Sequence, residues 1–182
     1  MRSLFGKLRV LPLFLVLSTS GLVLSLHSPS RAGDVASCQT LFAINRSKNK
    51  NIVNYDVCKT KDGAVDPDTP LVAYWVLRAE DGRRESLSWL ERQFGYGFSI
   101  LSDVGRDGFK MKLKAFPKRS LEVRRTRAHG FRAFVKIAGK RASLTSLYVK
   151  STDGGAMPRV EYVDVFGTDI ASGEAVRERL LP

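Results

Sequence analysis

The densest group of side chains that could do chemistry lies at residues 45–51, in the run Asn-Arg-Ser-Lys-Asn-Lys-Asn. Arg46 can make two parallel hydrogen bonds to a carboxylate or phosphate. Ser47, Asn49 and Asn51 add hydroxyl and amide groups that can contact sugar oxygens. Asparagine and lysine are also ordinary residues of a hairpin turn. The run therefore predicts either a ligand-binding loop or a structural turn.

One spacing within this run is typical of an enzyme. Ser47 and Lys50 match the Ser-x-x-Lys pattern of serine acyl transferases, in which the lysine lies one helical turn after the nucleophile. Here the segment separates two expected strands, and the motifs that accompany the pattern are missing. The spacing therefore gives little support for an acyl transferase.

A second candidate site combines aromatic rings with one carboxylate. Tyr74 and Trp75 are adjacent, and Glu91 and Tyr96 follow within a short distance along the chain. Rings beside a carboxylate can stack on a sugar or surround a cation. A Tyr-Trp pair on an apolar strand is equally typical of a core. No second carboxylate stands at a fixed spacing from Glu91, so a two-acid glycosidase mechanism has no support.

Metal and cofactor chemistry have little material to work with. The chain has 2 cysteines and 2 histidines, too few for a His/Cys metal site, and no cofactor is predicted. His129 is far along the chain from Cys38 and Cys58, which argues against a catalytic cysteine. In an oxidising compartment the two cysteines are expected to form one disulfide.

Positive charge is concentrated in one stretch. The whole chain carries a formal charge of +12, and residues 106–150 alone hold 14 basic and 2 acidic residues. Apolar and cationic residues alternate there as in a strand. Six cations are predicted on one sheet face: Lys110, Lys112, Lys114, Arg124, Arg132 and Lys136. Such a face attracts polyanions, or is simply a solvated surface. Anionic lipid, a cell-wall polymer or an acidic envelope protein would fit an exported chain, and nucleic acid would not.

The elements that must position these residues are mainly strands. Strands are expected at residues 40–45, 51–58, 71–77 and 160–166, and others begin near residues 97, 108, 119, 131 and 141. This spacing is typical of an antiparallel meander. One short helix is expected through Leu87, Leu90 and Phe94, capped by Ser86 and ended by Gly95. A mainly β barrel or two-sheet sandwich follows, because one flat sheet would leave an apolar face in water.

The first 32 residues have the features of a signal peptide. Arg2, Lys7 and Arg9 precede an apolar run at residues 11–26, which is shorter than a membrane span. Small residues predict cleavage after Ala32, which would leave residues 33–182 as one β-rich domain without a transmembrane span. The alternative is a lipobox at residues 35–38, in which Cys38 carries a lipid.

Four blocks of sequence resemble a known family. They are Leu41-Phe42-x-Ile44-x-Arg46-Ser47-x-Asn49-x-Asn51-x-Val53-x-Tyr55, Pro70-x-Val72-x-Tyr74-Trp75, Glu91-x-x-Phe94-x-Tyr96-Gly97 and Pro158-x-Val160-x-Tyr162-x-x-x-x-Gly167. Together they are similar to a bacterial exported family of unknown function, numbered 4833. The resemblance implies one compact domain behind an export signal. It assigns no reaction, cofactor or catalytic residue.

Two functions from different classes follow as expectations. The first is a non-enzymatic envelope module, in the periplasm or outside the cell, that binds an anionic or polar component. The second is an envelope hydrolase or transferase with a pocket around Arg46, Ser47, Asn49, Tyr55, Glu91 and Tyr96. Convergence of these side chains on one concave site with a shifted carboxylate would favour the enzyme. No catalytic residue is assigned.

Overall fold

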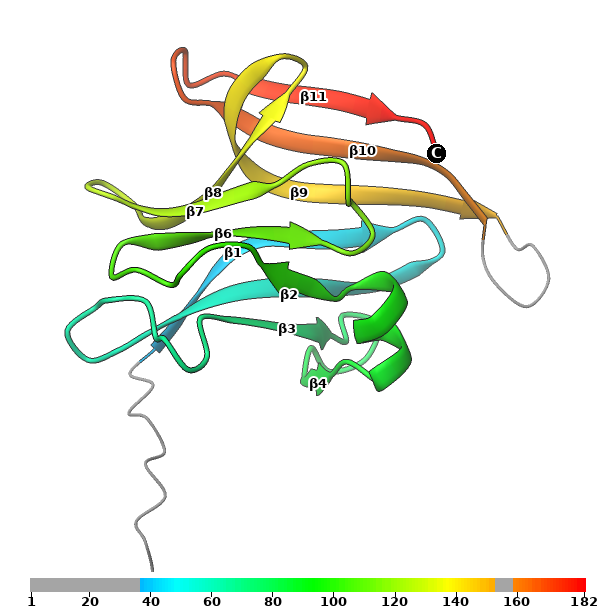
Figure 1. The fold of residues 1–182 in the computed structure, drawn as a ribbon. Coiled ribbons are helices and arrows are strands. Elements are labelled where there is room, and N and C mark those ends of the chain that lie inside the picture. Colours follow the sequence, from blue (N-terminus) through cyan, green and yellow to red (C-terminus); the bar gives the residue numbers. More distant parts are fainter. Residues whose placement is uncertain (1–36, 153–158) are drawn as a thin grey trace, which may run out of the picture. The chain divides into compact units, whose positions relative to one another are not determined.

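The computed structural model describes residues 37–152 and 159–182, which lie in one compact unit, Arg31–Pro182. The predicted signal peptide and half of the lipobox, residues 35–36, lie outside the described residues. Eleven strands make up most of this part of the chain (Figure 1). They are β1 (Ser37–Arg46), β2 (Asn49–Lys59), β3 (Leu71–Val76), β4 (Arg84–Ser86), β5 (Phe98–Ile100), β6 (Gly108–Leu113), β7 (Leu121–Thr126), β8 (Gly130–Ile137), β9 (Lys140–Thr152), β10 (Arg159–Asp169) and β11 (Ala175–Leu180).

The strands form one curled sheet that branches at β9. The order is β4-β3-β2-β1-β9-β8-β7-β6-β5, and β10 and β11 extend from the other edge of β9. The first part of β9 pairs with β8, and its later part pairs with β1. Two arms, β1–β4 and β5–β8, therefore leave the same edge of β9, and β6 and β7 cover β1 and β2 (Figure 1).

The core lies between these two arms because each strand turns its apolar residues inward. In β6, Phe109, Met111 and Leu113 are buried, whereas Lys110 is exposed. Side chains of a strand alternate between its faces, so this sequence can only bury one row and leave the cations outside. Buried residues of β1, β2 and β3 join the same cluster from the opposite arm.

The predicted fold class is confirmed. Residues 37–152 and 159–182 are mainly β and curl into a half-barrel, and one short helix lies among them. The predicted strand starts also agree with β5 to β9 to within two residues. One pairing lies outside the expected antiparallel meander: Ala43–Arg46 of β1 runs parallel to Ser146–Val149 of β9. In addition, β4 and β11 were not expected from the sequence.

The short helix differs from the prediction in its cap. Residues 89–90 are α-helical, and Glu91–Gly95 form a π-helical turn, η1, closed by a hydrogen bond from Tyr96 N to Glu91 O (2.7 Å). The cap is Ser88, whose hydroxyl accepts from Glu91 N (3.3 Å) while the Glu91 carboxylate accepts from Ser88 N (2.8 Å). This reciprocal pair is a capping box. The predicted cap, Ser86, lies in β4 instead.

The helix ends at Gly95, as the sequence predicted. Gly95 lies inside the π-helical turn, and Gly97 is the glycine that the turn requires. A Cβ atom at Gly97 would lie 1.7 Å from the carbonyl oxygen of Arg92. No helix in the described part of the chain has the length and apolar character needed to cross a bilayer.

Candidate functional site

Five of the residues singled out in the sequence come together at the open side of the half-barrel. The end of β1 supplies Arg46, β2 and β3 supply Tyr55 and Trp75, and η1 with the residue after it supplies Glu91 and Tyr96. The hydroxyl of Tyr55 donates to the carbonyl of Tyr96 (2.7 Å), and the indole N–H of Trp75 donates to Glu91 (3.0 Å). We call this group the Arg46 cluster.

Ring contacts make the cluster part of the core. Trp75 is buried and meets Tyr96 edge to face at 5.1 Å between ring centres. Tyr55 is fully buried and stacks on Phe42 at 4.6 Å. Burial is the main reason why the pKa of the Tyr55 hydroxyl is raised. The aromatic residues therefore pack as a core, which is the structural alternative that their sequence also favoured.

The carboxylate of the cluster is held in its ionised form. Burial raises the pKa of Glu91, but hydrogen bonds from Ser88 and Trp75 and the positive charge of Arg46 outweigh it, so the pKa is lowered. For Tyr96, burial raises the hydroxyl pKa more than the nearby Arg46 lowers it. The cluster thus contains an ionised carboxylate that has hydrogen-bond donors, and a neutral phenol.

The polar neighbours of Arg46 make contacts that hold the fold together. The Ser47 hydroxyl donates to the carbonyl of Ser151 (3.3 Å) and accepts from its N–H (3.2 Å), which ties β1 to β9. The Asn49 side chain accepts from Asn51 N (2.9 Å) within the β1–β2 turn. The Asn51 side chain accepts from Ala79 N (2.9 Å). All three side chains thus make hydrogen bonds within the fold, and of the three only Asn49 bonds within the turn itself.

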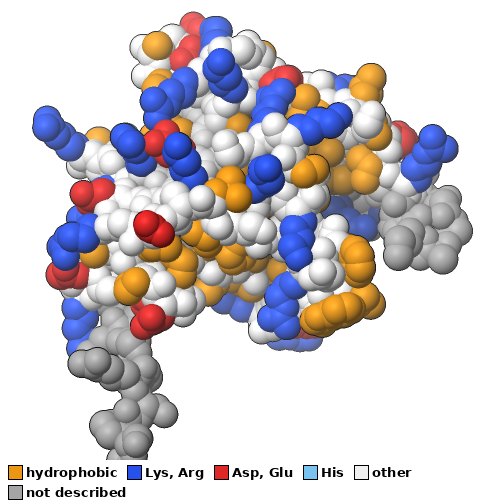
Figure 2. All heavy atoms as spheres, viewed as in Figure 1, with side chains coloured by type: hydrophobic (Ala, Val, Ile, Leu, Met, Phe, Trp, Pro, Cys, Tyr) orange, Lys and Arg blue, Asp and Glu red, His pale blue; other side chains and the backbone are white. Residues whose placement is uncertain are grey.

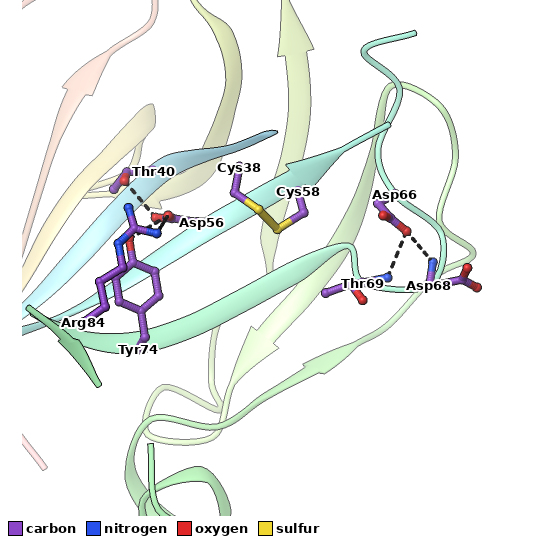
Figure 3. The surroundings of a disulfide bond; sticks show 9 residues. All are labelled: Cys38, Thr40, Asp56, Cys58, Asp66, Asp68, Thr69, Tyr74 and Arg84. Atoms are coloured by element: carbon purple, nitrogen blue, oxygen red, sulfur yellow. Dashed lines mark hydrogen bonds and ion pairs between the residues drawn. A yellow bond between two sulfur atoms is a disulfide. The ribbon is translucent and has the colours of Figure 1, made fainter. Parts of the chain in front are cut away.

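The expected disulfide is present between Cys38 and Cys58, which face each other across β1 and β2 (Figure 3). Beside it, the buried carboxylate of Asp56 accepts from the hydroxyls of Thr40 (2.8 Å) and Tyr74 (2.7 Å). Tyr74 therefore points away from Trp75, to the opposite face of β3. The Cys38 sulfur is bonded to Cys58, and one sulfur cannot also form a thioether to a lipid.

The structure places the predicted cations on the outward face of β6, β7 and β8. We call Lys110, Lys112, Lys114, Arg124, Arg132 and Lys136 the basic face. Register pairs Arg124 with Arg132 across β7 and β8, and Lys110 lies opposite Glu122. Figure 2 shows cationic side chains spread over the side on which β6 and β7 lie, with acidic ones among them. Like charges in neighbouring strands repel, so this arrangement favours an anion.

Three further features of the basic face were missed in the sequence. Arg141 lies opposite Lys136 because a two-residue turn, Ala138 and Gly139, joins β8 to β9. That short turn is a signal from which the pairing could have been predicted. Glu122 bonds both Arg124 (2.6 Å) and Arg141 (2.7 Å), so one acid lies among the cations. The third feature is a hollow.

This hollow, of about 750 Å³, adjoins the basic face between the loop at 102–108 and strands β6 and β7. Its lining includes Arg106, Lys110, Arg124 and Arg127. Two of these cations already have acidic partners, Asp62 for Arg106 (2.8 Å) and Glu122 for Arg124. The hollow, which Asp107 and Glu122 also line, therefore adds a concave place for an anionic group to the basic face.

Other clusters that sequence reasoning missed are structural. Arg179 and Arg177 donate to the buried carboxylate of Asp164, and these contacts lower its pKa to about 2. Arg179 also lies over the ring of Tyr162, at 3.7 Å from its centre. Arg177 and Arg179 lie two positions apart on β11, which pairs with β10. Strand alternation could therefore have placed the two arginines on the same face once β11 was known.

Fold and surface together define a single β-rich half-barrel unit with one strongly cationic face. The chain belongs to the family described as a domain of unknown function (DUF4833), whose model matches residues 42–179. The suspected family is thus confirmed. Comparisons with curated proteins and with solved structures returned no match.

Proposed function

We propose that the protein is exported across the cytoplasmic membrane and acts in the bacterial envelope as a non-enzymatic module that binds an anionic component. The basic face carries this proposal: its six predicted cations, together with Arg141, lie on one side of four adjacent strands, β6 to β9. Export is supported by the signal-peptide features of residues 1–32 and by the Cys38–Cys58 disulfide, because disulfides persist in oxidising compartments.

Electrostatics favours a partner with many negative charges. A single ion pair on an exposed surface contributes only about 0–1 kcal/mol. Several cations on a rigid sheet act together on a polymer or a charged surface, and their fields add. The hollow beside Arg124 would hold one anionic group of such a partner, while the rest of the basic face contacts the partner's other anionic groups.

The experiment compares binding of the protein to soluble polyphosphate and to vesicles that contain phosphatidylglycerol, over a range of salt concentrations. We expect binding at low salt that falls steeply as salt rises, because exposed charges are screened. The variant Lys110→Glu/Lys112→Glu/Lys136→Glu should bind polyphosphate at least ~10-fold more weakly.

A matched control variant changes the net charge of the protein by the same amount, but at positions outside the basic face. Lys50→Glu/Arg78→Glu/Arg159→Glu reverses three exposed cations that lie outside the basic face. This control should bind polyphosphate within about twofold of the parent protein, since remote charges are screened beyond roughly 10 Å. Equal losses in both variants would show that net charge alone drives binding, and no binding of the parent at low salt would refute the proposal.

The hydrolase or transferase alternative has less support. Arg46, Tyr55, Glu91 and Tyr96 do come together, but Ser47 and Asn49 make structural hydrogen bonds elsewhere. The Glu91 pKa is lowered, so the carboxylate is poorly suited to act as a general acid near neutral pH. Its hydrogen bonds to Ser88 and Trp75 instead hold η1 against β3.

A further inference from the structure

An apolar protrusion stands on η1 and the residues before it. Trp89, Leu90 and Phe94 have 67%, 60% and 67% of their surface exposed. Leu87, which precedes them at helical spacing, is buried, whereas these three side chains are exposed. Figure 2 shows apolar side chains gathered where Figure 1 draws the green helical turn, with cationic side chains next to them.

The π-helical turn explains why these side chains point outward together. Its hydrogen bond joins residues five apart, so one extra residue enters the turn and shifts the side chains around the helix axis. Trp89 and Phe94 have this spacing, and their rings meet edge to face at 6.5 Å. The two largest apolar side chains of the turn thus support each other in solvent.

The protrusion is held rigidly from below. Glu91 bonds Trp75 and Ser88, Leu87 is buried in the core, and Gly97 lets the backbone pass directly under the Arg92 carbonyl. A turn anchored in this way loses little conformational freedom when it meets a partner. Exposed apolar patches on a rigid support mark interaction surfaces.

Charge around the protrusion indicates the partner. The one acidic residue of residues 89–95 is Glu91, and its carboxylate points inward to Trp75. The exposed cations are Arg92 on the turn itself and Lys114, whose ammonium group donates to Gln93 (2.9 Å). Lys114 directly follows the end of β6, the strand that carries Lys110 and Lys112, so the basic face extends to the protrusion.

We infer that the anionic partner is a phospholipid bilayer, into whose interface Trp89, Leu90 and Phe94 insert while Arg92, Lys114 and the basic face contact the headgroups. This inference rests on the proposed function and names its partner. Trp and Phe favour the boundary between headgroups and acyl chains, and cations beside them bind anionic headgroups. A protrusion suits a soft surface, whereas a rigid protein partner would need a matching groove.

The two tryptophans of the chain allow a direct test. In Trp75→Phe, the remaining reporter is Trp89, and in Trp89→Phe it is the buried Trp75. We expect vesicles of phosphatidylethanolamine and phosphatidylglycerol with brominated acyl chains to quench Trp89 and shift its emission to shorter wavelength. Trp75 emission should be unchanged. Parent and variants share the same N-terminus, so residues 1–36 contribute equally to each comparison.

A variant of the protrusion separates insertion from charge attraction. Trp89→Ser/Leu90→Ser/Phe94→Ser should bind these vesicles at least ~10-fold more weakly, because three apolar side chains no longer leave water. Its binding to soluble polyphosphate should equal that of the parent. The matched control, Leu101→Ser/Ile170→Ser/Leu181→Ser, removes three other exposed apolar side chains and should leave vesicle binding unchanged.

The outcomes distinguish failure of this inference from failure of the proposed function. If Trp89 is not quenched and the protrusion variant binds vesicles like the parent, insertion is refuted, while polyphosphate binding still supports the basic face. Equal quenching by uncharged phosphatidylcholine vesicles would refute the requirement for anionic lipid. Equal loss of vesicle and polyphosphate binding in the protrusion variant would also refute insertion. Absence of binding to both probes by the parent would refute the proposed function itself.

Discussion

The side-chain amide of Gln39 pairs with the main chain of Phe131 as a neighbouring strand would. Its nitrogen donates to Phe131 O (3.0 Å) and to His129 O (3.1 Å), and its oxygen accepts from Phe131 N (3.1 Å). Gly130 lies directly beneath, where a Cβ atom would lie 2.5 Å from the Gln39 oxygen. One glutamine therefore joins the start of β1 to the start of β8, where no strand pairing connects the two arms.

Replacement of Gln39 should weaken the fold measurably. Gln39→Ala leaves the Phe131 N–H and two carbonyls without these partners, so the free energy of unfolding in urea should fall by about 1–2 kcal/mol. Gln39→Glu should be no better, because a carboxylate cannot donate to the carbonyls of His129 and Phe131. The control Gln93→Ala removes an exposed amide and should change stability by less than about 0.5 kcal/mol. A Gln39→Ala variant with the same free energy of unfolding as the parent would show that the amide pairing contributes little to stability.

The disulfide gives a second prediction. Cys38 and Cys58 are 20 residues apart, and opening a loop of this size should lower the free energy of unfolding by about 3 kcal/mol. The comparison is between the parent protein and Cys38→Ser/Cys58→Ser in urea. The purified parent should also contain no thiol that reacts before reduction. A lipid increment in the intact mass, with a free Cys58, would contradict the disulfide and support the lipobox.

A third prediction concerns acid. Hydrogen bonds from Arg119 are the main cause of the lowered pKa of Glu178, at about 2, and the Ala138 N–H adds to them. The folded-state pKa is below the unfolded value, so this stabilisation is complete above about pH 5 and is lost as the pH falls toward 2. Glu178→Gln should lower stability at pH 7 by roughly 2–3 kcal/mol.

The same variant should lose less stability than the parent between pH 5 and pH 2, because it no longer has this group to protonate. Urea unfolding at several pH values gives the difference in the free energy of unfolding between the two proteins. The other carboxylates are the same in both proteins, so their contributions cancel in this difference. The control Glu161→Gln changes an exposed carboxylate on β10 and should follow the parent curve. Parallel curves for Glu178→Gln and the parent would contradict the assignment.

The turn between β8 and β9 gives a stabilising substitution. Ala138 has a φ of 49°, the one positive value among the non-glycine residues that the structure describes. Asparagine tolerates this conformation better than alanine, so Ala138→Asn should raise the free energy of unfolding by about 0.5–1 kcal/mol. Ala128, in the neighbouring turn, has no such backbone angle, and Ala128→Asn should give no gain. Thermal unfolding of the two variants provides the comparison.

Strand alternation was enough to predict much of the fold. The rows of Phe109, Met111 and Leu113 in β6, and of Phe131 and Ala133 in β8, lie inside as their spacing indicates. In β11 the inward row includes Glu178, so its apolar alternation is interrupted. Its partner Arg119 lies about 60 positions earlier in the chain, and nothing in the local sequence shows this ion pair.

The candidate site, too, could be predicted only in part from the sequence. Arg46, Trp75 and Glu91 were chosen by residue type, and tertiary pairing brings them together. Ser47 has an equally suitable hydroxyl, but the pairing of β1 with β9 directs it to Ser151. Alternation shows which face of a strand a residue occupies, and it does not show which strand lies beside it.

The parallel pairing of β1 with β9 also sets an order of folding. Ala43 and Ser146 are partners although about a hundred positions separate them. The β1–β2 hairpin can form early from local contacts, but one edge of β1 stays open until the later half of the chain has been made. Contacts between such distant residues close large loops and slow the search for the native state. During that interval the open edge can pair with another chain, so refolding yield should fall as protein concentration rises.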